Sequence, residues 1–248
     1  MKYAAYCITR NLYHDVIPSL KSLLIHTDVD EVFLVIEDDT FPEPLPLDCV
    51  KTINVADQTF FPPNGPNSNS RFTYMAMMRV ALPFVLDVDR VLTLDPDVIF
   101  RQDAPEIFDL DIDDYYLSAS REYHKSTDSF LYINAGVVLY NLKRLRESGK
   151  GKEIIDFLNT HRRDFVEQDA VNELCQGGIL PMDPTYNANP WTNATFLSTY
   201  VHEPKVEHYA ATGGAWTQYD IVNKYRDIPW NEIMKELGGS KNEEKSGT

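Results

Sequence analysis

The first half of the chain alternates continuous apolar runs with a segment whose apolar residues recur every three or four positions. The apolar runs predict strands at residues 2–9, 31–38 and 50–56. The three-to-four spacing predicts a helix over residues 13–27, between the first two strands. Strands that alternate with helices in this way are typical of a parallel α/β sheet.

A loop dense in Pro, Gly, Asn and Ser at residues 57–70 interrupts this pattern. Apolar residues at helical spacing return over 70–86, where Pro83 interrupts or ends the predicted helix. The alternation is less regular beyond this point, so we expect a mixed, mostly parallel central sheet flanked by helices. The later pattern predicts strands at 113–120 and 131–142, and helices at 151–161, 167–175 and 219–237.

The run "DRVLTLDPDVIF" at residues 89–100 reads as a buried strand that carries two carboxylates near its end. On an extended chain Asp95 and Asp97 would project from the same face, and Pro96 favours an extended backbone at the residue before it. Two anions this close are tolerable beside a cation or in water. Carboxylates suit Mg²⁺ or Mn²⁺ bound together with a substrate diphosphate. The alternative is a turn in which both aspartates only face water.

Composition narrows the class of protein. The 248 residues are 43% hydrophobic and carry a formal net charge of −15, so we expect one globular domain that repels nucleic acid and anionic membrane surfaces. We place this domain at residues 1–238, with a disordered tail at 239–248. No apolar run approaches the length of a membrane span and no signal peptide is evident, so we expect a soluble, cytoplasmic protein.

Five blocks of sequence, taken in order, resemble glycosyltransferase family 8, the family of glycogenin and the lipopolysaccharide galactosyltransferases. One block joins Arg79 and Pro83 to the D-x-D run, and "INAGVVLYNL", "EQDAVN" and "VEHYAATGGAW" are similar to three later motifs. "ITRNLYHDVIPSLKSLL" resembles the nucleotide-binding turn of the family. Together the blocks cover roughly residues 3 to 216.

The resemblance implies a GT-A fold, a single Rossmann-like domain that binds a UDP-sugar donor through a divalent metal ion. The implied ion is Mn²⁺ or Mg²⁺, and its implied ligands are Asp95, Asp97 and His208. The side chain of Tyr13 would stack on the uracil ring. The implied contacts to the donor are Thr9, Asn11, Tyr13, Arg79, Asp95 and Trp216. For Trp216 a place in the core is the alternative, and for Arg79 a place on the surface.

The family retains the anomeric configuration of the sugar, which ordinarily calls for a carboxylate nucleophile. The corresponding residue here is Gln168, and an amide is a poor nucleophile. The resemblance therefore implies front-face attack, with the carbonyl of Gln168 stabilising the cationic sugar. Asn134 and Asp169 would bind sugar hydroxyls, although Asp169 could instead cap a helix.

The chain departs from the family pattern in the last block. Gly214 stands where the family usually has a Lys that contacts the diphosphate. Either another group replaces this cation or catalysis is slow. Lys205 and Arg79 are the candidates for replacing it.

Two other functions remain open at this point. A haloacid-dehalogenase-like phosphohydrolase also has a D-x-D motif after an apolar strand, but that motif normally lies near the N-terminus, and here its fifth residue is Ile99. The loss of the Lys leaves open a nucleotide-sugar-binding protein without catalysis. We expect a glycan acceptor and either glucose or galactose as the transferred sugar. The sequence fixes neither the acceptor, nor the sugar, nor the oligomeric state.

Overall fold

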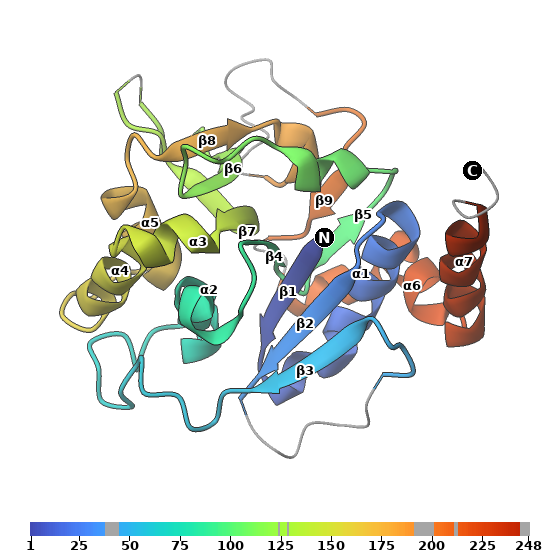
Figure 1. Cartoon of the computed structure of the whole chain (residues 1–248), viewed down its shortest axis with the longest axis horizontal. Helices are drawn as coiled ribbons and strands as arrows, with labels where there is room; N and C mark the ends of the chain where they lie inside the picture. The colour runs from blue at the N-terminus through green and yellow to red at the C-terminus, as the bar shows by residue number, and fades with distance from the viewer. Residues whose placement is uncertain (38–44, 124, 128, 191–200, 211–212, 244–248) are drawn as a thin grey trace.

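The computed structural model describes residues 1–37, 45–123, 125–127, 129–190, 201–210 and 213–243. Its centre is a seven-stranded sheet in which every strand except β7 runs in the same direction (Figure 1). The sheet confirms the expected mixed, mostly parallel α/β fold. In spatial order its strands are β3 (Val50–Asn54), β2 (Glu31–Ile36), β1 (Tyr3–Ile8), β4 (Arg90–Leu94), β7 (Ile133–Asn141), β6 (Leu117–Arg121) and β8 (Ile179–Met182).

Helices cover both faces of the sheet because both faces are apolar. In β1, Ala4, Tyr6 and Ile8 enter one core, whereas Ala5 and Cys7 enter the other, as the alternation of side chains along a strand requires. The first core packs against α1 (Tyr13–His26) and α7 (Trp230–Glu243), and α6 (Asp220–Asp227) packs on α1. The second core packs against α2 (Tyr74–Val85), α3 (Leu142–Glu147), α4 (Lys150–Leu158) and α5 (Val166–Leu174).

The run 89–100 differs from the single extended strand that its apolar residues predicted. The strand β4 ends at Leu94, a turn carries both aspartates, and β5 (Val98–Phe100) leaves the central sheet. Pro96 has no N–H to donate to a ladder, so the break falls at this residue. β5 pairs antiparallel with β9 (Val206–His208), and this small second sheet brings the late part of the chain to the turn.

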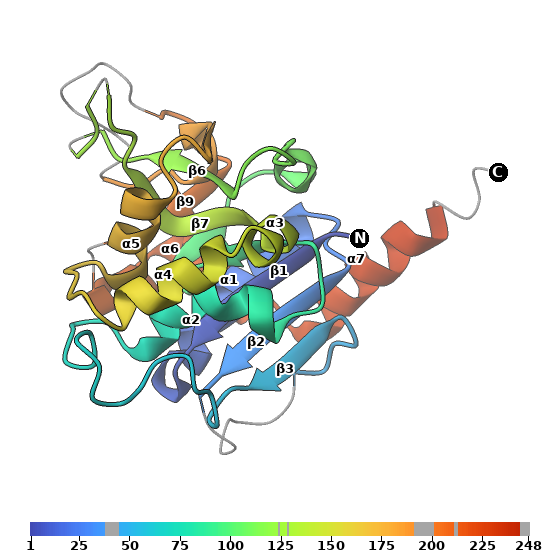
Figure 2. The ribbon, with the colours of Figure 1, turned by 60° about the vertical axis from the view of Figure 1, so that its left-hand side comes forward.

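The C-terminal segment forms two helices where the apolar spacing predicted one. Pro229 lies between α6 and α7, and the ammonium group of Lys21 on α1 donates hydrogen bonds to the carbonyl oxygens of Arg226, at 2.8 Å, and Ile228. Figure 2 shows α7 extending away from the sheet. This helix continues to Glu243, past Gly238 where we expected the domain to end. Residues 244–248 of the expected tail lie outside the described residues. No helix in the described ranges is long and apolar enough to cross a membrane.

Four short 3₁₀ segments complete the described structure. They are η1 (Arg10–Leu12), η2 (Pro105–Asp109), η3 (Pro184–Tyr186) and η4 (Gly213–Gln218). The first of them connects the end of β1 to the start of α1, at the edge of the sheet where the D-x-D turn also lies.

Candidate active site

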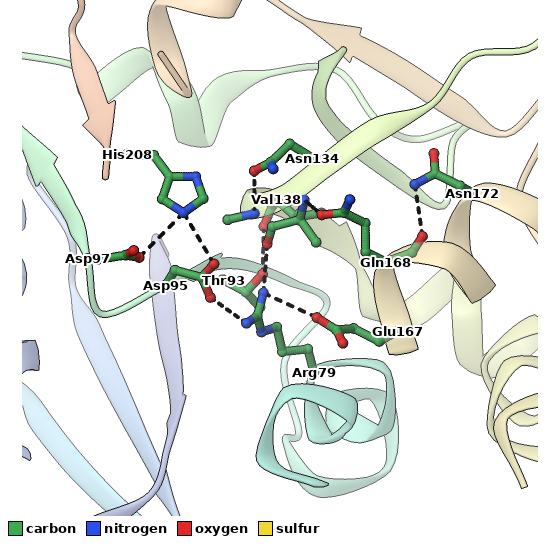
Figure 3. A network of polar contacts seen from close by, with 12 residues as sticks. Arg79, Thr93, Asp95, Asp97, Asn134, Val138, Glu167, Gln168, Asn172 and His208 are labelled. Carbon is green, nitrogen blue, oxygen red and sulfur yellow. Dashed lines mark hydrogen bonds and ion pairs between the residues drawn. The ribbon is translucent and has the colours of Figure 1, made fainter. Parts of the chain in front are cut away.

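Asp95, Asp97 and His208 meet in space although the histidine is far along the chain from the aspartates. Each offers one ligand atom, and these three atoms lie within 4.8 Å of one another. The Nε2 atom of His208 is 3.4 Å from Oδ2 of Asp95 and 3.4 Å from Oδ1 of Asp97 (Figure 3). The cause is the β5–β9 pairing, which sets Val98 opposite His208.

The imidazole of His208 is held in one orientation. Its Nδ1 atom is 3.0 Å from the side-chain oxygen of Asn187, so Nε2 faces the two carboxylates. Gly136 on β7 makes room for the ring, since a Cβ atom at this position would lie 2.1 Å from Cε1 of His208. This clash explains why a glycine stands at this position of the "INAGVV" block.

When no metal ion is bound, the two carboxylates of this cluster favour a protonated ring at His208. Burial favours the neutral imidazole, but the carboxylates of Asp97 and Asp95 outweigh it and raise the pKa of His208 to about 10. Burial also opposes ionisation of Asp95, yet the guanidinium of Arg79 and the ring of His208 lower the pKa of that carboxyl below its usual range. The cluster therefore has a strong preference for a positive charge between the aspartates.

Arg79 is buried beneath the D-x-D turn. One of its terminal nitrogens donates to the carboxylate of Asp95, and the other donates to the carbonyl oxygen of Ala135 at 2.7 Å. The second nitrogen also lies 3.5 Å from Oε1 of Glu167. Because the guanidinium is 8% exposed, the alternative of a surface Arg is wrong. Arg79 instead fixes Asp95.

Glu167 is the least satisfied charged group near the site. Both the Oε2 atom of Glu167 and the Nε atom of Arg79 are buried without a hydrogen-bond partner. Burial raises the pKa of Glu167 to about 7, even though the nearby guanidinium of Arg79 works in the opposite direction. A neutral carboxylic acid is therefore favoured at this position below pH 7.

Gln168 and Asn134 lie side by side over β7. The carbonyl oxygen of Gln168 accepts the backbone N–H of Ala135 at 2.9 Å, and its amide nitrogen lies 3.2 Å from Oε1 of Glu122. Asn134 donates to the same Glu122 oxygen at 2.7 Å. These contacts orient both amides toward the cavity described below. The carbonyl of Gln168 already accepts one hydrogen bond, so its assistance to a cationic sugar stays a prediction.

Asp169 makes contacts typical of a helix start. One carboxylate oxygen accepts the backbone N–H of Phe165 at 2.9 Å, and the other accepts the hydroxyl of Tyr132. Its link to Phe165, the residue before α5, supports the capping alternative. A contact between Asp169 and a sugar hydroxyl stays a prediction.

The residues expected to bind the nucleotide lie at the same edge of the sheet as the aspartates. β1 pairs with β4 so that Ala5 is opposite Thr93, which brings the ends of both strands to one edge. Thr9 follows β1 and donates its hydroxyl proton to the side chain of Asn11 in η1. Tyr13 begins α1. The structure thus brings these three residues to the edge that also holds the D-x-D turn.

Trp216 packs in the protein core. It is 4% exposed, belongs to a cluster with Ile99, Val222 and Tyr225, and stacks on Tyr209 with ring centroids 6.2 Å apart. These contacts favour the core alternative for this residue. A role in covering the donor stays a prediction.

A cavity of about 560 Å³ opens over the cluster, a size typical of ligand pockets. Three of the residues that form its wall are Asp95, Asp97 and His208. The other residues that line it are Arg71, Phe72, Glu122, Asn134, Phe165, Gln168 and Ala210. The cavity thus joins the candidate metal ligands to the candidate catalytic amides.

Comparison with known proteins assigns the chain to a family. The sequence profile described as "Glycosyl transferase family 8" matches residues 4–220. The chain belongs to glycosyltransferase family 8. The glycosyltransferase GlyE of Streptococcus pneumoniae is 26% identical over 181 residues, which cover 68% of this chain and 44% of that protein. General stress protein A of Bacillus subtilis is 24% identical over 199 residues, 66% of this chain and 69% of that protein.

Solved structures share the fold of this family 8 member. The crystal structure of GlyE from Streptococcus pneumoniae covers 97% of this chain with a TM-score of 0.74 at 20% identity, over 64% of its own length. The galactosyltransferase LgtC, solved in complex with donor and acceptor sugar analogues, covers 94% of this chain and 100% of its own at a TM-score of 0.65 and 22% identity. This chain spans about half the length of the first curated relatives it matches. Family membership does not favour the phosphohydrolase alternative.

A divalent cation fits the residues of the cluster. Two carboxylate oxygens and one imidazole nitrogen suit Mn²⁺ or Mg²⁺ better than a soft metal. The Asn187 contact fixes the tautomer of His208 in the manner of an outer-shell partner of a metal ligand. The same position now attracts a proton to the ring, and a metal ion would replace that charge.

Several lining residues escaped the sequence interpretation. Glu122 and Asn187 contact the candidate residues directly, and Arg71, Phe72 and Phe165 form the opposite wall of the cavity. Phe165 adjoins the "EQDAVN" block and Arg71 precedes the helix of Arg79, so proximity to a motif was the one available signal. Glu122 and Asn187 lie outside every block, and their role follows only from the fold.

Proposed function

We propose that this family 8 member is a metal-dependent, retaining glycosyltransferase that moves a hexose, glucose or galactose, from a UDP-sugar to a hydroxyl of a glycan or similar acceptor. The observation that supports it most is the meeting of His208 with Asp95 and Asp97 at the floor of the cavity. Retention, the UDP group and the hexose follow from the family resemblance. The cluster of Asp95, Asp97 and His208 supports the part of the proposal that concerns metal dependence.

Asp95, Asp97 and His208 would hold the ion, and a bound Mn²⁺ or Mg²⁺ would neutralise the diphosphate that leaves. Arg79 keeps Asp95 ionised and in place through its hydrogen bond. Asn187 and Gly136 do the same for the ring of His208. The protein thus prepares its side of the metal site before any ligand arrives.

Transfer would proceed by front-face attack. The acceptor oxygen forms a bond to the anomeric carbon while the bond from that carbon to the phosphate oxygen breaks, and the hydroxyl proton passes to the departing phosphate oxygen. Gln168 and Asn134 line the cavity, where the sugar would bind, and are held by Glu122 and the backbone of Ala135. Their task is to orient the sugar and to stabilise its developing positive charge.

Gly214 stands where the family usually has a Lys that contacts the diphosphate. Neither Arg79 nor Lys205 is placed to supply that positive charge instead. Arg79 is committed to Asp95, Ala135 and Glu167. Lys205 pairs with Glu106 and does not line the cavity. A metal ion bound by Asp95, Asp97 and His208 would therefore have to neutralise most of the charge on the leaving group.

The decisive experiment is UDP release from UDP-glucose and UDP-galactose, with Mn²⁺ and with a chelator. We expect donor hydrolysis that requires the metal, and loss of it in Asp97→Asn but not in the control Asp156→Asn, whose carboxylate pairs with Lys152 on the surface of α4. Tight binding of UDP without turnover would instead favour a binding protein. Release of inorganic phosphate from sugar phosphates would contradict the proposal.

A further inference from the structure

A second cavity of about 360 Å³ adjoins the first and is lined largely by cationic side chains. Arg71 and Phe165 line both cavities, so the two lie side by side, and we call the second one the cleft. The remaining lining residues of the second cavity are Ser70, Arg162, Arg163 and Asp164. The candidate metal ligands do not take part in this second cavity, which therefore lies beyond the donor site.

Two cationic side chains pack against the ring of Phe165. The Cζ atom of Arg71 is 4.4 Å from the ring centroid, and Nζ of Lys125 is 3.6 Å from it. Arg71 also lies 4.7 Å from the centroid of Phe72. A guanidinium that packs against aromatic rings still has N–H groups that can bind a carboxylate or phosphate in a bidentate manner.

These cations are not neutralised by the part of the chain that the structure describes. Arg163 pairs with Glu173 at 2.6 Å. By contrast, none of the ion pairs within the described ranges involves Arg71, Lys125 or Arg162. Arg71, Arg162 and Arg163 line the second cavity together with one carboxylate, that of Asp164. In a chain with a net charge of −15, this excess of positive charge is a local reversal of sign.

We propose that this cleft is an acceptor subsite for a glycan that carries an anionic group, a phosphate or a carboxylate, bound by Arg71 and Arg162, with Lys125 beside them on the Phe165 ring. The inference rests on the proposed function, because it identifies the cleft beyond the donor site as the acceptor side. The anion is distinct from the donor diphosphate, which must lie at Asp95, Asp97 and His208. The strongly acidic protein would otherwise repel such an acceptor, and the cationic wall offsets that repulsion.

The test uses small probes with the full chain and with UDP and Mn²⁺ saturating the donor site, so that phosphate cannot bind there. Calorimetry compares glucose, glucose 6-phosphate and glucuronic acid at constant ionic strength. We expect at least one anionic probe to bind about tenfold more tightly than glucose, as one to two charge-assisted hydrogen bonds provide. The two anionic probes distinguish a phosphate-bearing from a carboxylate-bearing acceptor.

Single variants then show whether the cleft causes the preference for anionic probes. Arg71→Gln and Arg162→Gln should each reduce the ratio of anionic to neutral affinity several-fold, whereas the control Lys143→Gln, an exposed cation on α3, should leave the ratio unchanged. Equal binding of all three probes, or a preference that survives both arginine variants, would overturn the proposal. Binding does not need turnover, so failure of donor hydrolysis in the separate UDP assay would count against the proposed function alone.

Discussion

The two walls of the cavity are built in opposite ways. Asp95, Asp97 and His208 belong to the inner wall. Behind this wall Arg79 is 8% exposed and contacts Asp95, Ala135 and Glu167. On the outer wall, Arg71 is exposed and rests on aromatic rings. Apart from Oε2 of Glu167 and Nε of Arg79, the polar groups behind the inner wall are largely paired with one another, whereas the outer wall keeps the hydrogen-bond donors of Arg71 for a ligand. The comparison suggests that donor chemistry belongs to the first wall and acceptor choice to the second.

The most direct test of this difference replaces an arginine by glutamine behind the inner wall and on the outer wall. Arg79→Gln should lower the free energy of unfolding by about 3 to 5 kcal/mol, because it leaves buried carboxylates without their cation. Arg71→Gln should change it by less than about 0.5 kcal/mol, as is usual for a surface position. Urea denaturation of both variants gives the two values. Similar losses in the two variants would mean that the outer wall is structural as well.

The next largest effect concerns the metal ligands. Asp97→Asn should reduce metal-dependent UDP release by about 100-fold or more, beyond the 10- to 100-fold typical of outer-shell partners. Asp97 pairs with His208, whose ring can lose its proton, and none of the ion pairs in the described ranges joins it to Arg79, so stability should change less than for Asp95. Asp95→Asn should reduce activity as strongly and also destabilise the protein, since Asp95 pairs with the buried Arg79. Equal stability of the two variants would show that the Arg79 pair is not fixing the turn.

Gly136 tests how closely the inner wall is packed. In Gly136→Ala the new methyl group would meet the ring of His208 at 2.1 Å, and because β7 is a central strand the ring must move. We expect a 10- to 100-fold loss of UDP release, partly rescued by higher Mn²⁺ concentration. Gly151→Ala on α4, where the nearest neighbours are 3.3 Å away, is the control. An active Gly136→Ala with unchanged metal affinity would contradict the role assigned to the ring.

Sequence reasoning predicted the inner wall far better than the outer wall. The order of strands and helices, the D-x-D turn and the distant histidine all carry local patterns, because strand ends and metal ligands need particular residue types at fixed spacing. The cleft lined by Arg71 and Arg162, with Lys125 on the neighbouring Phe165 ring, comes from three segments without such a pattern, and the packing around Phe165 brings them together. The break of residues 89–100 into two sheets was equally hidden, because both halves are apolar.

A smaller effect on the inner wall depends on pH. The pKa of Glu167 is about 7 in the folded protein against 4.5 as the ordinary value. A raised carboxyl pKa means that its contribution to stability is complete below pH 4.5 and is lost as the pH rises through 7. Glu167 should therefore contribute a loss of about 1 to 3 kcal/mol between pH 5 and pH 8, and Glu167→Gln should remove this part of the slope.

Glu147→Gln, an exposed position on α3, is the control for the pH measurement and should keep the slope of wild type. Denaturant unfolding at several pH values measures all three proteins. A slope unchanged by Glu167→Gln would show that another group causes the pH dependence.

The smallest effect is expected for a cation that lies away from both walls of the cavity. Lys205→Ala removes an ammonium that pairs with Glu106 away from the cavity. We expect less than a twofold change in UDP release and at most about 1 kcal/mol in stability, as for most exposed ion pairs. A large loss of donor hydrolysis would show that Lys205 does take over the task of the missing Lys.

The small β5–β9 sheet also has a consequence for the order in which the protein is completed. All strands of the seven-stranded sheet are present once synthesis reaches Met182, whereas the third candidate metal ligand arrives only with β9. A growing chain can therefore close its main sheet while it is still unable to hold an ion. A chain that stops short of position 208 would contain every strand of the central sheet but would lack the candidate metal ligand His208 and the helices α6 and α7 that pack on α1.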